Sequence, residues 1–184
     1  MANHSKRLAT TLFLFLLSVA AYGGKTATIR SYPLPDHGHI DLSVPASWQD
    51  KVRQPRHRFP PTIVFTPENG FSFRILVTPL WEDGKALPDR EQLRQDIDHA
   101  IKDMHEVFIE NEISIKEIKG ESDTGYYFSA TMRSPKPGEY RHVTQGMLTI
   151  GKLTTAFTVL TNDGNDDVVA DALRMLAGAT QSQD

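Results

Sequence analysis

Two pairs of strand-like segments, each joined by a short turn, limit the fold of this chain more than any other feature. The first pair covers residues 62–66 and 71–78 and turns at Pro67-Glu68-Asn69-Gly70. The second pair covers residues 142–150 and 153–161 and turns at Gly151-Lys152. Turns this short join neighbouring strands in antiparallel order, whereas parallel strands need a long crossover. The sequence therefore predicts a mainly antiparallel sheet.

Three further segments have the composition of strands. In residues 38–48, Ile40, Leu42 and Val44 alternate with polar residues, and Pro45 ends the pattern. Residues 113–119 and 125–133 are also predicted to be strands, whereas the polar, proline-containing residues 49–61 are predicted to form a loop. Residues 156–160 are almost all apolar or β-branched, which is typical of a central strand covered on both faces.

Two amphipathic helices are predicted. Asp89 is a capping residue at the start of residues 89–108, with Gln92 three positions later. Six apolar side chains of this segment lie on one stripe: Leu93, Ile97, Ala100, Ile101, Met104 and Phe108. Residues 166–177 form the second helix, which Asn165 can cap. An antiparallel sheet with two such helices indicates an α+β protein. We expect an α/β/α sandwich of about six or seven strands, with a helix on each face.

The first 23 residues have the three-part layout of a secretory signal peptide. Lys6 and Arg7 precede an apolar run at residues 8–21, and small residues follow. The run is shorter than the roughly 20 residues that span a bilayer, although an uncleaved anchor is the alternative. We therefore expect a signal peptide at residues 1–23 and a single domain at residues 24–184. The mature protein would be periplasmic or secreted and would contain no transmembrane segment.

Charge and cysteine content exclude several classes of protein. The formal net charge is −3, and removal of Lys6 and Arg7 with the signal would change it to −5. A chain of this charge lacks the dense basic surface of a nucleic-acid-binding protein. The chain contains no cysteine, which excludes disulfides, thiolate metal sites, thiol catalysis and a lipid-modified cysteine.

Four short phrases, in their order along the chain, resemble the PsbP-like superfamily, which includes PsbP, the Ran-binding Mog proteins and the bacterial DcrB-like proteins. The phrases are HIDLSVPASW from His39, GYYF from Gly125, GML from Gly146 and AFTVL from Ala156. The resemblance implies a sandwich scaffold that binds partners and does not catalyse. Three features differ from individual branches of the superfamily. The secretory signal does not suit the Ran-binding Mog proteins, and the missing cysteine does not suit the lipid anchor expected of DcrB-like proteins. The segment before the first strand is too short for a docking segment like that of PsbP. No binding residue of the family is therefore carried over.

A cluster of cations is the first candidate site. Lys51, Arg53, Arg56 and Arg58 fall within eight residues, and no acidic residue follows them before Glu68. Arginine forks suit carboxylates or phosphates, so we expect this segment to recognise an anionic partner, most simply a protein. A solvated loop without a partner is the alternative.

Two other arrangements offer alternative functions. His37, His39 and Asp41 alternate, so on a strand they would share one face and could hold zinc or copper in a small-ligand or metal carrier. The simpler interpretation is the wet face of a half-covered strand, and we expect no metal or cofactor. Asp96, His99, Asp103 and Glu106 lie near one another on the first helix without matching a metalloprotease motif.

The leading hypothesis is a secreted or periplasmic, non-catalytic binding or accessory protein. No segment matches a nucleophile elbow or a phosphate-binding glycine loop. The alternatives are the carrier described above and an enzyme with an unrecognised polar site.

Overall fold

The computed structural model describes residues 26–55, 59–82, 84–120 and 124–183. The predicted signal peptide lies outside these residues. None of the helices within the described ranges has the length and apolar character required to cross a membrane.

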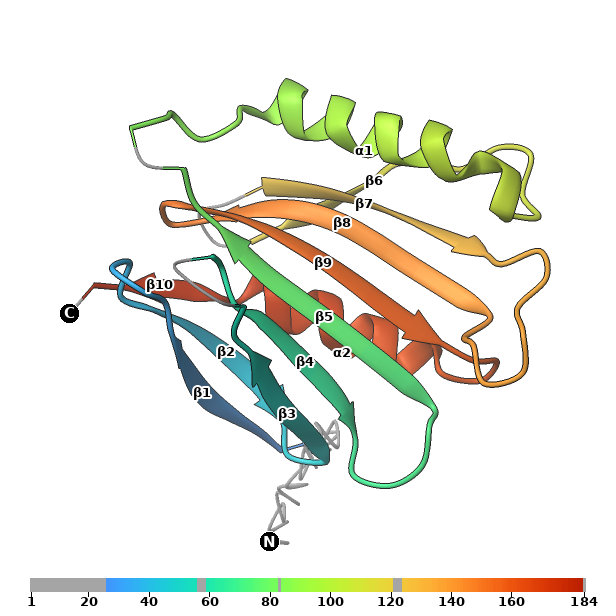
Figure 1. Cartoon of the computed structure of the whole chain (residues 1–184), viewed down its shortest axis with the longest axis horizontal. Helices are drawn as coiled ribbons and strands as arrows, with labels where there is room; N and C mark the ends of the chain where they lie inside the picture. Colours follow the sequence, from blue (N-terminus) through green and yellow to red (C-terminus); the bar gives the residue numbers. More distant parts are fainter. Residues whose placement is uncertain (1–25, 56–58, 83, 121–123, 184) are drawn as a thin grey trace, which may run out of the picture.

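Seven antiparallel strands form the main sheet, as Figure 1 shows. Their spatial order is β3-β4-β5-β9-β8-β7-β6, so β5 and β9 lie near the centre and β3 and β6 at the edges. Their bounds are β3 Trp48–Arg53, β4 Thr62–Pro67, β5 Phe73–Leu80, β6 Lys116–Lys119, β7 Thr124–Thr131, β8 His142–Ile150 and β9 Leu153–Thr161. The β4–β5 and β8–β9 hairpins confirm the two pairs predicted from the sequence.

A second, three-stranded sheet packs beside the first. It consists of β1 (Ala27–Pro33), β2 (His39–Pro45) and the C-terminal β10 (Thr180–Ser182), in the order β1-β2-β10. Ile40, Leu42 and Val44 of β2 are fully buried, as their alternation predicts.

The two helices lie on opposite faces of the main sheet, with α1 (Arg90–Met104) at the top of Figure 1 and α2 (Asp166–Ala177) beneath the sheet. Side chains of α1 pack with β7 and β8 in one apolar cluster, which includes Ile97, Ile101 and Phe128. A larger cluster joins the opposite face to α2 and the small sheet, and it includes the buried Phe157. These two layers confirm an α+β sandwich with a mainly antiparallel sheet.

Four local predictions need correction. Residues 48–53 form strand β3, although a loop was expected at 49–61. Strands β1 and β10 were not predicted. Helix α1 ends at Met104 and not at Phe108, because a short 3-10 helix, η1 (His105–Val107), follows, and Phe108 then pairs with Met132.

The two predicted helix caps differ. Asp89 accepts a hydrogen bond from the backbone nitrogen of Gln92 at 2.8 Å, as expected. Asn165 stands at the start of α2, but its side chain makes no capping bond. Its amide donates instead to the carbonyls of Asn162 and Asp163, and this holds the turn that enters the helix.

Candidate functional site

Each face of the main sheet has an area that its helix does not cover. Helix α1 packs mainly against β7 and β8 and borders a small groove over β9 and β5, which leaves most of the same face of β3, β4 and β5 without a helix across it. On the opposite face, α2 packs against β9, β6 and the small sheet, and a cavity lies between α2 and part of β7 and β8. We call the first area the basic face and the second the His142 pocket.

Strand pairing defines the side chains of the basic face. Residues that are directly opposite in neighbouring strands point to the same face of a sheet. Lys51 lies opposite Val64, and Arg53 lies opposite Thr62, so both cations share the face of Leu76 and Thr78. The cross-strand rows are Lys51, Val64, Leu76 and Thr158; Arg53, Thr62, Thr78 and Ala156; and Gln49, Thr66, Arg74 and Leu160. None of these twelve residues is acidic.

The structure separates the four predicted cations. Lys51 and Arg53 are exposed on edge strand β3, whereas Arg56 and Arg58 lie outside the described residues. Arg74 of β5 was not predicted as part of the site. It is the one charged residue in an otherwise strand-like segment, and that interruption is the signal in the sequence that could have identified it.

Arg74 is half-buried beside the ring of Phe71. Its guanidinium carbon lies 5.9 Å from the centre of the Phe71 ring, and Phe71 stacks on Tyr140 at 4.4 Å between ring centres. The Nε of Arg74 and the hydroxyl of Tyr140 are both buried without a hydrogen-bond partner. Burial raises the pKa of Tyr140, although the charge of Arg74 lowers it in part.

The His142 pocket is a half-open cavity of about 340 Å³. Hydroxyl groups dominate the sheet side, where Ser129 and Thr144 share a hydrogen bond of 2.9 Å. Val169 and Leu173 of α2 form an apolar wall opposite them. The cavity therefore offers donors and acceptors on one side and an apolar surface on the other.

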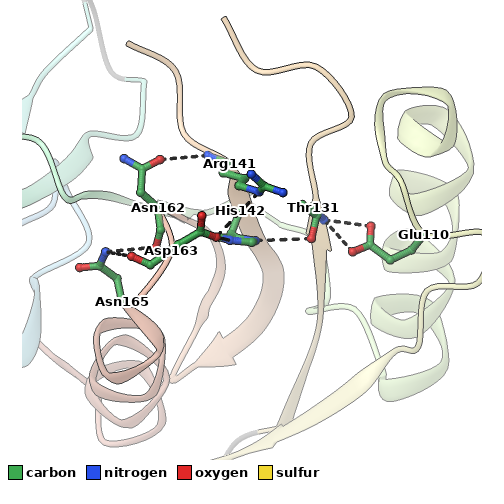
Figure 2. Close-up of polar contacts among 7 residues, drawn as sticks. All are labelled: Glu110, Thr131, Arg141, His142, Asn162, Asp163 and Asn165. Carbon is green, nitrogen blue, oxygen red and sulfur yellow. Dashed lines mark hydrogen bonds and ion pairs between the residues drawn. The ribbon is translucent and has the colours of Figure 1, made fainter. Parts of the chain in front are cut away.

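His142 lies at the centre of a chain of polar contacts that Figure 2 shows. Its Nε2 is 2.7 Å from a carboxylate oxygen of Asp163, and its Nδ1 is 3.4 Å from the hydroxyl of Thr131. The backbone nitrogen of Thr131 donates to both oxygens of Glu110, at 3.0 and 2.9 Å. In the same view, the backbone nitrogen of Arg141 donates to the side-chain oxygen of Asn162.

Both carboxylates in this network are held in the ionised form. The hydrogen bond from His142 lowers the pKa of Asp163. Burial works to raise the pKa of Glu110, but its hydrogen bonds with Thr131 outweigh that effect and lower it. Both carboxylates therefore act as hydrogen-bond acceptors in this network.

His37, His39 and Asp41, the residues of the metal-carrier hypothesis, make other contacts in the structure. The ring of His37 packs on Trp81 at 4.4 Å between centres. Asp41 lies 3.7 Å from Nε2 of His39 and accepts hydrogen bonds from Ser31 and Ser182. The bond from Ser31 lowers the pKa of Asp41 most strongly. In the described part of the chain, no group of three or more His, Asp or Glu side chains is arranged to hold a metal ion.

The polar residues singled out on α1 do not form a cleft. Asp96 accepts a hydrogen bond from Gln92 at 2.8 Å and borders a small groove of about 130 Å³ beside the basic face. His99, Asp103 and Glu106 are exposed.

These layers define a PsbP-like fold, and comparison with solved structures supports that assignment. Cyanobacterial PsbP (CyanoP) from Synechocystis sp. PCC 6803 is similar with a TM-score of 0.53 and 13% identity, over 90% of this chain and 99% of that one. LpqN of Mycobacterium tuberculosis, described as involved in cell envelope biogenesis, is similar with a TM-score of 0.51 and 16% identity, over 85% and 92% of the two chains. Identities this low show the fold alone.

Searches by sequence add no relative. No protein-family model matches the chain, and no curated protein matches it. The structural similarity to CyanoP and LpqN alone confirms the fold resemblance predicted from the four phrases.

Proposed function

We propose that this chain is an exported, non-catalytic accessory protein that binds an acidic segment of a partner protein on its basic face. One observation carries the proposal. Lys51, Arg53 and Arg74 lie on the half of the sheet that α1 does not cover, and their cross-strand rows contain no acidic residue. This local excess of cations occurs in a chain with more acidic than basic residues.

The composition of the basic face suits reversible binding. Val64 and Leu76 provide an apolar floor between the cations, and threonines keep that floor wettable when no partner is bound. In a protein of net negative charge, a basic patch orients the approach of an acidic partner and raises the association rate.

A role outside the cytoplasm is supported by two points. The predicted signal peptide directs the chain to the periplasm or the exterior. LpqN, which shares the fold, is described as involved in cell envelope biogenesis. Neither point identifies the partner.

The test is a titration of the mature protein with a synthetic peptide in which leucine and glutamate alternate, followed by ¹H–¹⁵N NMR. We expect chemical-shift changes confined to β3, β4, β5 and β9, and weaker binding as the salt concentration rises, because exposed charges are screened over about 10 Å at 0.1 M salt. Lys51→Gln/Arg53→Gln should weaken binding. Lys119→Gln/Lys152→Gln, which removes two positive charges elsewhere, should weaken it less.

Three results would refute the proposal. The first is that a peptide with glutamine in place of glutamate binds equally well. The second is that the two double variants lose affinity equally. The third is that anionic lipid vesicles bind the protein and the acidic peptide does not. The last result would identify a membrane surface as the partner.

A second candidate function is the binding of a small polar ligand in the His142 pocket, favoured by the hydroxyl groups that meet there. Ser129→Ala/Thr144→Val would remove their hydrogen-bonding capacity at little change in volume. A ligand that raises the Tm of the wild type and not of this variant would support a carrier function.

A further inference from the structure

We infer that Arg74 and Tyr140 together bind one carboxylate group of the acidic partner segment, and that Phe71 shields them in the free protein. This inference rests on the proposed function, because it assigns the anchor point on the same basic face. Lys51 and Arg53 lie on the exposed edge strand and attract the partner without fixing its position. Arg74 lies on β5, between β4 and β9, and is the cation placed to do so.

Arg74 is a half-buried arginine inside a sheet, and its Nε has no hydrogen-bond acceptor in the described part of the chain. Among the described residues, no carboxylate forms an ion pair with Arg74, and its Nε is shut off from water without an acceptor. A buried donor without a partner costs free energy, and buried polar groups in folded proteins are nearly always paired. Arginine presents its donors in a planar fork that matches a carboxylate, so a bound carboxylate would satisfy it.

The hydroxyl of Tyr140 is a second buried group without a partner in the described ranges, independent of Arg74. Tyr140 is only 8% exposed, and its hydroxyl has no hydrogen-bond partner. Buried tyrosine hydroxyls usually find a partner. The two side chains lie on the same ring, since the Arg74 guanidinium carbon is 5.9 Å from the centre of Phe71 and the Tyr140 ring is stacked 4.4 Å from it.

Phe71 explains how two such groups remain dry. Its ring contacts both the Arg74 guanidinium and the Tyr140 ring, yet 46% of its own surface is exposed. It belongs to the turn between β4 and β5, outside the hydrogen-bonded part of either strand. A rotation of this one side chain would open a path to both donors. The cation–π contact with Phe71 compensates Arg74 in part while no carboxylate is bound.

The experiment uses the same leucine–glutamate peptide and three variants of the mature protein. Arg74→Lys retains the charge but loses the fork, and Tyr140→Phe loses only the hydroxyl. Each should weaken binding about tenfold, as expected for a central contact of an interface. The NMR signal of the Arg74 Nε–H group should move on addition of peptide to the wild type. Phe71→Ala should bind at least as tightly as the wild type, because it removes the shield.

Thermal unfolding distinguishes this role from a structural one. A hydroxyl that has no partner in the free protein contributes nothing by hydrogen bonding, so the Tm of Tyr140→Phe should equal or exceed that of the wild type. A clear fall in Tm would show that the hydroxyl is partnered within the fold and would overturn the inference. Loss of binding in Phe71→Ala would also overturn it, since Phe71 would then be the contact.

Failure of this inference differs from failure of the proposed function. If Lys51→Gln/Arg53→Gln weakens binding but Arg74→Lys and Tyr140→Phe do not, the basic face binds acidic partners and the anchor is wrong. If the wild type does not bind the peptide, both are wrong.

Discussion

Gly146 offers the most direct test of how tightly the centre of the main sheet is packed. It lies in β8 between Tyr127 of β7 and Phe157 of β9. A Cβ atom at this position would come within 2.5 Å of the backbone oxygen of Tyr126 and 2.6 Å of the Phe157 ring. Both distances are far shorter than an ordinary contact of about 3.5–4.0 Å between carbon atoms.

The two clashes differ in how easily they can be relieved. The Phe157 ring can shift only if the buried cluster around it repacks, and the Tyr126 carbonyl belongs to the strand that pairs with β8. Overpacking a core with one extra carbon typically costs about 1–3 kcal/mol, and a clash with backbone belongs at the top of that range. We therefore expect Gly146→Ala to lower the free energy of unfolding by about 3 kcal/mol.

Urea unfolding of four variants measures this effect. Gly178→Ala is the control, because the nearest atom to its new Cβ would lie at 3.6 Å and its backbone is not in the left-handed region. It should be neutral, or stabilising by up to about 1 kcal/mol. Phe157→Leu should relieve only the ring clash, so the double variant should lose at least about 0.5 kcal/mol less than the sum of the single variants. A loss under about 1 kcal/mol in Gly146→Ala would refute the close packing of β7, β8 and β9.

Three further predictions concern the core, the small sheet and export. Phe157→Ala should lower the free energy of unfolding by about 3–5 kcal/mol in urea, because this side chain is 2% exposed and belongs to the larger apolar cluster. Asp41→Asn should lower the free energy of unfolding at pH 7, because the folded protein lowers the pKa of Asp41. The difference in stability between variant and wild type should vanish as the pH falls below the ordinary carboxyl pKa of 3.8 and through the lowered pKa of the folded state. A difference in stability that persists in strong acid would contradict this. Intact-mass analysis of exported protein should show a first residue between Tyr22 and Lys25, and a membrane-bound chain that retains Met1 would contradict cleavage.

The strands and helices that bury a periodic apolar face could be predicted from the sequence. Strand β3 could not, because it lies at the edge of the sheet and buries only Trp48; its other five residues are exposed, and this removes the alternation on which a prediction depends. Strand β10 pairs with β2 across almost the whole chain, and such a pairing has no local signature. Strand β1 pairs with β2 through a turn at residues 34–38 that contains Pro35 and Gly38, but only Tyr32 of β1 is buried, so the strand itself lacks a buried alternating face.

The candidate site was predictable in part for the same reason. The nearness of Lys51 and Arg53 follows from their positions in the chain, but their shared face with Arg74 follows from the register of β3, β4 and β5. The contact between His142 and Asp163 joins residues 21 positions apart across a turn. The predicted hairpin of residues 142–150 and 153–161 places His142 opposite Thr161, two residues from Asp163, so its register could have indicated this contact. The register of β3 could not be used in the same way, because β3 was not predicted.

The width of the main sheet accounts for the uncovered basic face. Seven strands have six spacings of about 4.8 Å, a width of about 29 Å, whereas a helix with its side chains is about 10–12 Å across. One helix therefore covers about two strands, and on one face α2 is assisted by the small sheet. On the other face α1 acts alone over β7 and β8, so the remaining strands must be wettable or bound by a partner. Threonines and cations make them wettable, and the buried Nε of Arg74 is a donor on this face that water does not satisfy.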